Sequence, residues 1–221
     1  MLGLISQVYN EEKKIEKWLK PLLEYVDKAY IIDDGSIDKT YEVLFNIAYG
    51  HENVWIYTEA HLGYDRYHMK LRELAETDWV IRLDVDEEID TIDLAKIMMT
   101  HIPWCDEHGY DSIKVTMKDY IDGRFIRDQE KIRIFKNADY IIHPGKIHTE
   151  EIGFKNTLFV PEITINHRRT KEEVLKGTEE MLRELKLNLD AYELIWHRTR
   201  EAGLGKELDE IIKKLDIHVK V

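Results

Sequence analysis

The sequence predicts an α/β fold in which a mixed central sheet is flanked by helices and followed by a helical C-terminal appendage. Three observations support this prediction. Short apolar runs typical of buried strands alternate with helical segments over the first hundred residues. Stretches with a two-residue alternation follow, and from Thr170 onward apolar residues recur at helical spacing. Because strands separated by helices pair in parallel through right-handed crossovers, the first half should form a parallel sheet.

The elements of the first half follow from local patterns. Four apolar runs suit buried strands, at residues 2–9, 29–32, 53–57 and 79–83. Helical spacing predicts helices at residues 15–26, from 36 or 38 to about 48, 68–76 and 91–100. Pro21 falls inside the first of these helices and should kink or restart it. Ser36 or Asp38 can cap the second helix, and Gly50 is a C-terminal stop signal.

The second half has a different pattern. Residues 112–117 and 131–135 alternate, and a short apolar stretch covers residues 163–165, with Gly123, Gly145 and Gly153 between them. These stretches indicate antiparallel or mixed additions to the sheet. No Pro/Gly/Ser-rich linker separates them from the C-terminal helices. We therefore predict one α/β domain over residues 1–168, with a helical extension over residues 169–221 packed on the same domain.

Composition limits the functions that the chain can have. It has 221 residues, 44 acidic and 32 basic side chains, and a formal net charge of -12. Nucleic acids and anionic membrane surfaces are polyanions, so this excess of acid argues against general affinity for either. Cys105 is a single cysteine and can form neither an internal disulfide nor a thiolate zinc site. The first residues lack a basic signal-peptide region, and no apolar run approaches the ~20 residues that span a bilayer. We therefore expect a cytoplasmic protein.

Polar clusters follow three of the predicted strands. They occupy residues 9–11 (Tyr-Asn-Glu), 33–36 (Asp-Asp-Gly-Ser) and 84–88 (Asp-Val-Asp-Glu-Glu). Ligands of open parallel sheets bind beyond the carboxyl ends of the strands, where these clusters should meet. Carboxylates at close range raise one another's pKa unless a cation neutralises them. Mg²⁺ and Mn²⁺ bind carboxylate oxygen and share their coordination shell with substrate phosphates, so the sequence predicts a divalent cation at this edge.

Each cluster by itself also has an ordinary structural explanation. Residues 33–36 are typical of a turn followed by a helix cap, and residues 84–88 suit the acidic start of a helix, which the helix dipole favours. The order and spacing of the clusters are more specific than any one of them.

Taken together, these segments resemble glycosyltransferase family 2, which has the GT-A fold. The resemblance rests on residues 8–12 (Val-Tyr-Asn-Glu-Glu), 31–40 (Ile-Ile-Asp-Asp-Gly-Ser-Ile-Asp-Lys-Thr) and 78–88, which are similar to the family's DxD segment. Residues 132–135 (Ile-Arg-Ile-Phe) and 143–148 (His-Pro-Gly-Lys-Ile-His) resemble stretches of the branch that includes lipopolysaccharide core glucosyltransferases. The resemblance implies a GT-A type, Rossmann-like nucleotide-diphospho-sugar transferase fold over residues 1–168.

The resemblance also implies a function for the clusters. Such enzymes transfer a sugar from a nucleotide-diphosphate donor, a UDP- or GDP-sugar, to an acceptor hydroxyl, and invert the anomeric carbon. The expected cofactor is Mn²⁺ or Mg²⁺, held by Asp86, with Asp84 assisting or contacting the ribose; His167 is a further candidate ligand. The residues expected to hold the nucleotide lie at the first two strand ends, and Asp33 or Asp34 should accept from the base. They are Tyr9, Asn10, Glu11, Asp33, Asp34 and Ser36.

Inversion requires a general base near the acceptor hydroxyl. The family takes this base from the second half of the domain, so Glu150 is the first candidate and Glu151 the second. Here the sequence departs from the family pattern. Thr149 separates His148 from Glu150, whereas the related branch has His followed directly by Glu. Asp119 and Asp128 therefore stay open as alternatives.

Other functions and partners also stay open at this point. A nucleotide-sugar-binding protein without catalysis would retain both Asp84 and Asp86. A phosphohydrolase that uses these two residues usually carries them after its first strand, whereas here they follow the fourth. The acceptor, whether a glycan, a lipid-linked compound or another hydroxyl compound, is not specified. Basic side chains in the C-terminal helices leave open a peripheral contact with the inner face of the membrane, and a homodimer also stays open.

Overall fold

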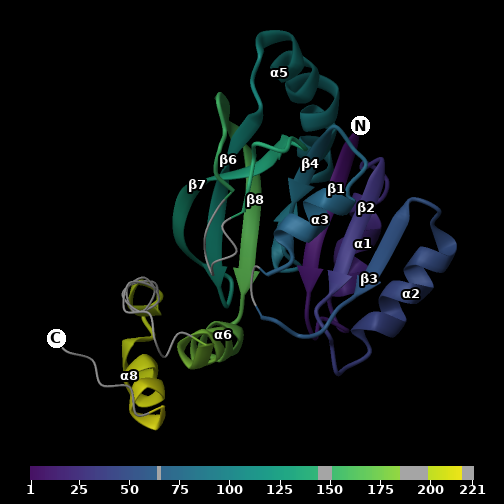
Figure 1. The fold of residues 1–221 in the computed structure, drawn as a ribbon. Coiled ribbons are helices and arrows are strands. Elements are labelled where there is room, and N and C mark those ends of the chain that lie inside the picture. The colour runs from purple at the N-terminus through teal and green to yellow at the C-terminus, as the bar shows by residue number, and fades with distance from the viewer. Residues whose placement is uncertain (64–65, 144–150, 185–198, 216–221) are drawn as a thin grey trace. The chain divides into compact units, whose positions relative to one another are not determined.

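The computed structural model describes residues 1–63, 66–143, 151–184 and 199–215 (Figure 1). The chain divides into two compact units, which are described separately below. Unit 1 comprises Met1–Met117 and Gln129–Asn166, and unit 2 comprises Lys118–Asp128 and His167–Val221. Unit 2 thus takes in residues 118–128 besides the C-terminal helices.

Strands and helices alternate through the first half, as the sequence predicts. The strands are β1 (Leu2–Val8), β2 (Lys28–Asp33), β3 (Val54–Thr58), β4 (Trp79–Arg82), β5 (Glu87–Ile89), β6 (Ser112–Ile121), β7 (Arg124–Lys136) and β8 (Thr157–Arg169). The helices are α1 (Ile15–Leu22), α2 (Thr40–Gly50), α3 (His68–Leu74), α4 (Thr91–Lys96), α5 (Ile102–His108), α6 (Lys171–Glu184) and α8 (Gly205–Lys214). A π-helical turn, Ile97–His101, joins α4 to α5.

These strands form one mixed sheet, so the predicted fold class is confirmed. Among the described residues the strand order is β3-β2-β1-β4-β7-β6-β8-β5. β1 pairs in parallel with β2 and β4, and β2 pairs in parallel with β3. β4 pairs antiparallel with β7, where the chain changes from crossover helices to directly connected strands.

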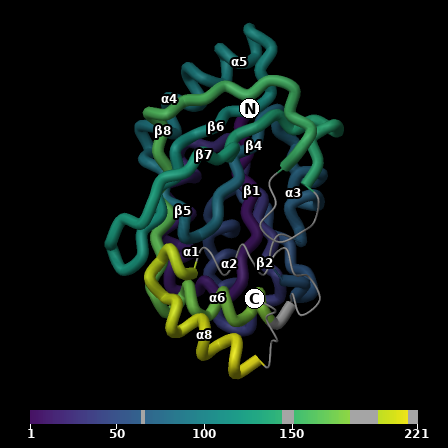
Figure 2. Tube along the Cα trace, turned by 90° about the vertical axis from the view of Figure 1, so that its left-hand side faces the viewer, coloured from purple at the N-terminus to yellow at the C-terminus, as the bar shows by residue number. Residues whose placement is uncertain are grey.

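Helices pack on both faces of the parallel strands. Successive side chains of a strand point to opposite faces, so Ile31 of β2 joins the core cluster that includes α1 and α2, whereas its neighbour Tyr30 joins the cluster that includes Leu71 of α3. Figure 2 shows α1 and α3 on opposite sides of β1. The buried residues of α1 recur at intervals of three and four, which is the spacing of a helix with one apolar face. They are Ile15, Trp18, Leu19 and Leu22.

The region after β4 differs from the helix start that residues 84–88 could have formed. Glu87–Ile89 form the short strand β5, and α4 begins only at Thr91. Asp90 caps α4, because its carboxylate accepts a hydrogen bond of 2.8 Å from the backbone N–H of Ile92. The helix predicted to end at residue 100 continues through the π-helical turn to His108. It ends at Gly109, whose φ of 74° is the left-handed conformation common at helix ends.

The antiparallel strands are longer than their sequence pattern predicts. β6 and β7 form a hairpin whose turn is made by Asp122 and Gly123, with φ of 48° and 76°. Two successive residues with positive φ favour Asp-Gly, because this turn matches the right-handed twist of the strands. Gly123 therefore lies at the tip of a hairpin, whereas the sequence pattern indicated only a break between strands at this residue.

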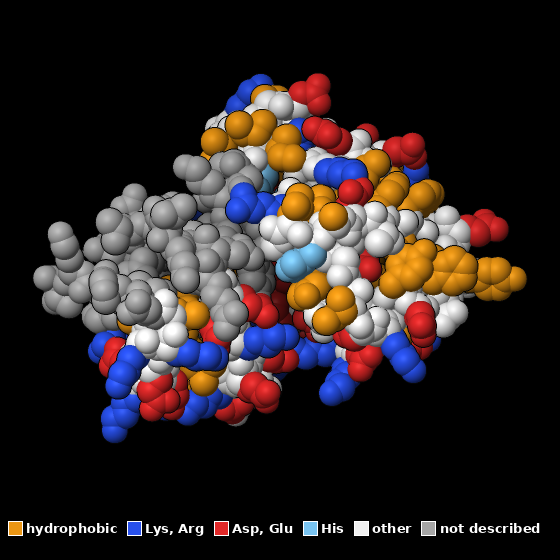
Figure 3. Space-filling view, turned by 60° about the horizontal axis from the view of Figure 1, so that its bottom comes forward, with side chains coloured by type: hydrophobic (Ala, Val, Ile, Leu, Met, Phe, Trp, Pro, Cys, Tyr) orange, Lys and Arg blue, Asp and Glu red, His pale blue; other side chains and the backbone are white. Residues whose placement is uncertain are grey.

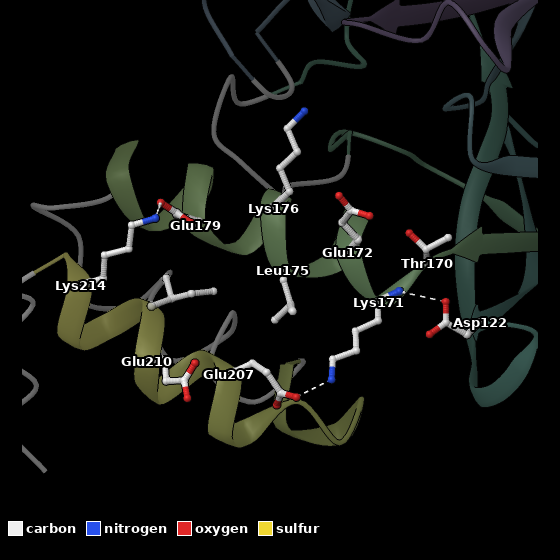
Figure 4. Close-up of a pocket in the computed structure, with 11 residues that line it drawn as sticks. Asp122, Thr170, Lys171, Glu172, Leu175, Lys176, Glu179, Glu207, Glu210 and Lys214 are labelled. Carbon is white, nitrogen blue, oxygen red and sulfur yellow. Dashed lines mark hydrogen bonds and ion pairs between the residues drawn. The ribbon is translucent and has the colours of Figure 1, made fainter.

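The helices of unit 2 pack through a small apolar cluster. Leu182 of α6 and Leu208 of α8 are buried against each other's helices. Beside them lies a groove of about 790 Å³ lined mainly by charged side chains (Figure 4). Lys171 is ion-paired with Glu207 across the groove, and Lys214 Nζ lies 2.8 Å from Glu179 Oε1. Both ion pairs connect α6 to α8. We therefore interpret the groove as part of the packing of these two helices.

We find no helix in the described parts of the chain with the length and apolar character needed to cross a membrane.

Candidate functional site

The carboxyl ends of neighbouring parallel strands bring the predicted polar clusters to one edge of unit 1. β2, β1 and β4 are adjacent in the sheet. Val8, the last residue of β1, is the register partner of Asp33 in β2, and Ile5 of β1 is the partner of Arg82, the last residue of β4. The residues that follow these strands therefore share an edge. They are Tyr9, Asn10, Glu11, Asp34, Ser36, Asp84 and Asp86.

The loops after β1 and β2 are tied to each other by hydrogen bonds. The backbone N–H of Asn10 donates to Ser36 Oγ at 2.9 Å, and the N–H of Ile37 donates to Asn10 Oδ1 at 2.9 Å. Glu11 N–H donates to Thr40 Oγ1 at 2.7 Å. Asn10 has a φ of 56°, a left-handed conformation that asparagine tolerates better than most residues. Ser36 thus joins the two loops and does not cap α2.

The carboxylate of Asp34 is saturated by bonds within the protein. Oδ1 accepts from the N–H of Leu62 at 2.8 Å, and Oδ2 accepts from the N–H of Gly63 and from Gln7 Nε2, both at 3.1 Å. His61 Nδ1 lies 3.0 Å from Oδ2. Asp34 therefore holds the loop after β3 against β1.

Asp33 is bonded differently from Asp34, although both side chains are buried. In the described part of the chain, its bonds come from the N–H and the hydroxyl of Ser36, and both end on Oδ1. Its Oδ2 keeps the capacity to accept a hydrogen bond. Of the two carboxylates that the sequence offered for contact with a nucleobase, Asp33 has the available oxygen.

An aromatic pair lies beside this carboxylate pair. The rings of Tyr9 and His61 are stacked, with centroids 4.1 Å apart and an interplanar angle of 20°. The His61 side chain is 46% exposed, so a planar ligand can reach it. His61 is not among the site residues predicted from the sequence. Its place after β3 was nevertheless a usable signal, because β3 is parallel to β2 and its carboxyl end lies at the same edge of the sheet.

Asp84 and Asp86 follow β4, and their surroundings are electrostatically crowded. Burial and the nearby Glu87 carboxylate raise the pKa of Asp84 to about 6, and Asp86 adds to the shift, while Arg133 and Arg82 oppose it. Within the described residues no group of three His, Cys, Asp or Glu side chains comes together as a metal cluster. Two carboxylates fit Mg²⁺ or Mn²⁺, which complete their shells with water and substrate phosphate oxygens. The donor set and the excess negative charge both suit such a cation.

A buried ion pair supports the segment that carries these two aspartates. Glu87 accepts from Arg133 Nε at 3.1 Å and also from Nη2, and the two side chains are 2% and 8% exposed. Glu87 Oε2 also accepts from the N–H of Asp84 at 3.3 Å, and its backbone oxygen accepts from Trp18 Nε1 at 2.9 Å. Burial alone would lower the pKa of Arg133, but Glu87 and Asp84 raise it, so the guanidinium stays charged. Through the hydrogen bond from the Asp84 N–H to Glu87, the ion pair fixes the backbone of Asp84.

The candidates for the general base lie in different parts of the chain. Glu150 lies outside the described residues. Glu151 is buried and ion-paired, because its Oε1 accepts from Arg82 Nη1 at 2.9 Å. Its Oε2 has no hydrogen-bond partner among the described residues. Asp119 and Asp128 belong to unit 2, whereas Asp84 and Asp86 belong to unit 1.

His167 also belongs to unit 2, where it contacts Asp119. Its Nδ1 lies 2.8 Å from Asp119 Oδ1, and Arg127 Nε donates to Asp119 Oδ2 at 3.0 Å. Although burial raises the pKa of Asp119, the hydrogen bonds from His167 and Arg127 outweigh it and lower the pKa to about 2. A histidine with a carboxylate on one ring nitrogen is oriented like many metal ligands, but the same contact also occurs in structural ion pairs.

Replacing Asp119 with asparagine should destabilise the protein in a pH-dependent way. Lowering the pKa from 3.8 to about 2 corresponds to roughly 2 kcal/mol of stability. This contribution is fully present above about pH 4 and is lost as the pH falls from about 4 to about 2, because the native carboxylate then becomes protonated. Urea unfolding of both proteins between pH 6 and pH 2 measures the difference. Glu201→Gln, which removes the 54% exposed partner of Arg127, is the control and should cost about 0.5 kcal/mol or less.

A difference between the wild type and Asp119→Asn that stays constant from pH 6 to pH 2 would contradict this account of the Asp119 carboxylate.

The chain is similar to a known protein family and to a curated protein. The profile of the family described as Glycosyl transferase family 2 matches residues 4–169. The dolichyl-phosphate beta-glucosyltransferase ALG5A of Trichomonas vaginalis is 38% identical over 66 residues, which cover 25% of this chain and 20% of that protein. The aligned segment is thus a small part of the relative's length.

Solved structures share the fold at low sequence identity. TarS 1-349 from S. aureus in complex with UDP has a TM-score of 0.60 and 16% identity, and the match covers 100% of this chain and 75% of that one. The match to S. aureus TarS covers 85% of this chain and 40% of that one. The mannosyltransferase PcManGT from Pyrobaculum calidifontis, in complex with GDP-Man and Mn²⁺, has a TM-score of 0.60 and 11% identity over 100% of this chain and 76% of that one. At these identities the likeness concerns the fold.

Proposed function

The chain belongs to glycosyltransferase family 2, and from this membership we propose that it transfers a sugar from a nucleotide-diphosphate sugar to an acceptor hydroxyl with inversion. The observation that carries the proposal is the shared edge of β2, β1 and β4. There, a carboxylate with an available oxygen and a stacked aromatic pair lie on neighbouring strands beside two crowded aspartates. The first two features suit a nucleoside, and the third suits a cation and its diphosphate.

In this proposal the loops after β1 and β2 hold the nucleotide. Asp33 Oδ2 accepts from the base, and Tyr9 and His61 offer a planar surface for it. Asn10, Glu11, Ser36 and Asp34 act mainly by fixing the loops that present these groups. UDP and UDP-GlcNAc are bound in the TarS structures and GDP-Man in PcManGT, so UDP- and GDP-sugars are the donor classes to test.

Asp86 and Asp84 would hold Mn²⁺ or Mg²⁺ at the end of β4. The bound cation would neutralise the negative charge that develops on the leaving nucleoside diphosphate. Glu87 and Arg133 keep Asp84 in place, because Glu87 Oε2 accepts from the Asp84 N–H and is ion-paired with Arg133. His167 stays a candidate for a further ligand.

The general base removes the proton from the acceptor hydroxyl as its oxygen attacks the anomeric carbon. Attack opposite the leaving diphosphate in a single displacement inverts that carbon. Glu150 is our first choice, because the carboxylate of Glu151 is buried against the guanidinium of Arg82. Glu151, Asp119 and Asp128 are the alternatives.

Replacing Glu150 with glutamine should lower kcat by about 100-fold, because a positioned base contributes at least this factor. Donor binding should be unchanged, since the base acts on the acceptor. Steady-state transfer assays and calorimetric titration of the donor measure the two effects. Glu151→Gln is the matched control: it should mainly reduce stability, because Arg82 is left as a buried charge without its partner. A full loss of kcat in the control, with Glu150→Gln active, would move the base to Glu151.

The proposed function is tested by incubating the protein with a panel of UDP- and GDP-sugars and Mn²⁺ and measuring release of the nucleoside diphosphate, with and without hydroxyl acceptors. Turnover of at least one donor is expected. Tight donor binding without turnover under any acceptor would instead indicate a nucleotide-sugar-binding protein without catalysis. Release of inorganic phosphate from phosphate monoesters would indicate a phosphohydrolase.

A further inference from the structure

A row of large apolar side chains lies on the exposed face of α2. It comprises Tyr41, Phe45 and Tyr49 of α2, which are 43%, 56% and 89% exposed, together with Ile37, which lies in the bend before the helix and is 87% exposed. In the space-filling view, orange side chains run over α2 as a row to the right-hand end of the picture (Figure 3). Within α2, the spacing of four residues places Tyr41, Phe45 and Tyr49 one above the next along the helix, and the ring centroids of Tyr41 and Phe45 lie 6.3 Å apart. We call this feature the α2 row.

The α2 row is not needed to attach the helix to the protein. Leu44 and Ile47, on the opposite face of α2, are buried in the core of unit 1. A surface helix of a monomer normally carries polar residues on its outer face, whereas α2 has only Glu42 and Asn46 as exposed polar side chains between Tyr41 and Gly50. An exposed apolar patch of this kind marks an interaction surface.

The charge of α2 favours a protein partner over a lipid surface. Helices that lie in a membrane interface carry lysine or arginine on their polar face, which attract anionic lipids. The sequence of α2 contains no lysine, arginine or histidine, and its one charged residue is Glu42. The chain as a whole carries a net charge of -12, which an anionic surface repels.

The geometry and size of the α2 row suit a second copy of the same chain. Residues spaced by four form a ridge that packs against an identical ridge at a crossing angle of about −50°, the commonest packing of two helices. A two-fold axis makes such a contact complementary to itself. An aromatic side chain buries roughly 150–250 Å² when fully covered, and the side chains of the row are 43–89% exposed, so full coverage would bury on the order of 500 Å² per copy. The total of about 1,000 Å² lies at the lower limit of the size expected of a specific interface.

We propose that the α2 row is the contact surface of a homodimer, in which α2 packs on α2 of a second copy. The contact would begin at Ile37, whose backbone N–H donates to Asn10 Oδ1 in the loop after β1. The dimer goes beyond the proposed function and does not depend on it.

The test is analytical ultracentrifugation of the full chain over a range of concentrations. The wild type should show a reversible increase from the mass of one chain to that of two. Phe45→Glu should remain at the mass of one chain at every concentration and should still fold, because residue 45 is exposed. Met99→Glu, at an 80% exposed apolar residue outside the row, is the matched control and should dimerise like the wild type.

Two results would overturn the proposal. One is a wild type that stays at the mass of one chain at every concentration. The other is a Phe45→Glu variant that dimerises as tightly as the wild type. Flotation with phosphatidylcholine and phosphatidylglycerol vesicles distinguishes the alternative partner: vesicle binding by a monomeric wild type, lost in Phe45→Glu, would show a lipid-binding surface in place of a dimer contact.

Discussion

Replacing Asp86 with alanine should abolish the metal-dependent binding of nucleoside diphosphates and lower sugar transfer about a thousand-fold. A cation that offsets charge on a leaving group contributes several kcal/mol, and about 4 kcal/mol corresponds to this factor. Asp86 is expected to be the principal protein ligand, and burial and Glu87 would still raise the pKa of the remaining Asp84 carboxyl above its usual value. The alanine variant should still fold, because the variant removes one negative charge from a crowded edge.

Calorimetric titration of UDP and GDP, each with and without Mn²⁺, measures the binding effect, and the transfer assay measures the rate. Glu88→Ala is the matched control, because Glu88 is an exposed acid on β5 two residues further along the chain. It should retain both metal-dependent binding and turnover. If Asp86→Ala binds the nucleotides with Mn²⁺ as tightly as the wild type, the acidic segment after β4 is only a solvated loop and the cation site must be sought elsewhere.

Replacing Arg133 with methionine should reduce the free energy of unfolding by about 3–5 kcal/mol. Glu87 and Arg133 are both buried, and removing one partner leaves the other as an uncompensated charge. The double variant Glu87→Gln with Arg133→Met should lose much less stability, because both charges of this pair are removed together while the glutamine can still accept from the Asp84 N–H. Urea unfolding of the two single variants and the double variant gives the coupling energy directly.

The same pair should also affect function through the position of Asp84. Arg133→Lys keeps the charge but loses the two-pronged contact with Glu87, so it should fold and bind Mn²⁺ with the nucleotide about tenfold more weakly, as is usual when support for a metal ligand is altered. Arg72→Lys is the matched control, since Arg72 is buried and donates to the backbone oxygen of Ala138. Equal effects of the two lysine variants on Mn²⁺ affinity would show that Arg133 has only a structural role.

The sequence by itself determined the local features of this protein. The apolar periods fixed the alternating strands and helices of the first half, because each period reflects which face of an element is buried. The turn and polar residues that follow β1, β2 and β4 could be predicted to form a ligand site, because ligands bind at the carboxyl edge of a parallel sheet. The resemblance to glycosyltransferase family 2 agrees with the profile match over residues 4–169.

Some elements of the second half and of the segment after β4 could not be predicted from local sequence patterns. The hairpin of β6 and β7 extends further than its apolar alternation, because a buried position of β6 is occupied by Asp119 and residues 124–132 of β7 include no buried side chain. The short strand β5 replaces the acidic helix start because its backbone pairs with β8, which is distant in sequence. The π-helical turn Ile97–His101 joins α4 to α5, whereas the sequence pattern predicted that the helix ends at residue 100.

Only the tertiary structure decided which polar residues are partners. The antiparallel pairing of β7 with β4 places Arg133 beside the end of β4, where the chain continues to Glu87 of β5, and neither residue shows a local sign of this contact. Asp33 and Asp34 are adjacent and alike in sequence, yet Asp34 is saturated by the loop after β3 while Asp33 keeps an available oxygen. Contacts of this kind join residues far apart in the chain. Strand order and register bring them together, whereas a sequence period reports only the burial of neighbours along one element.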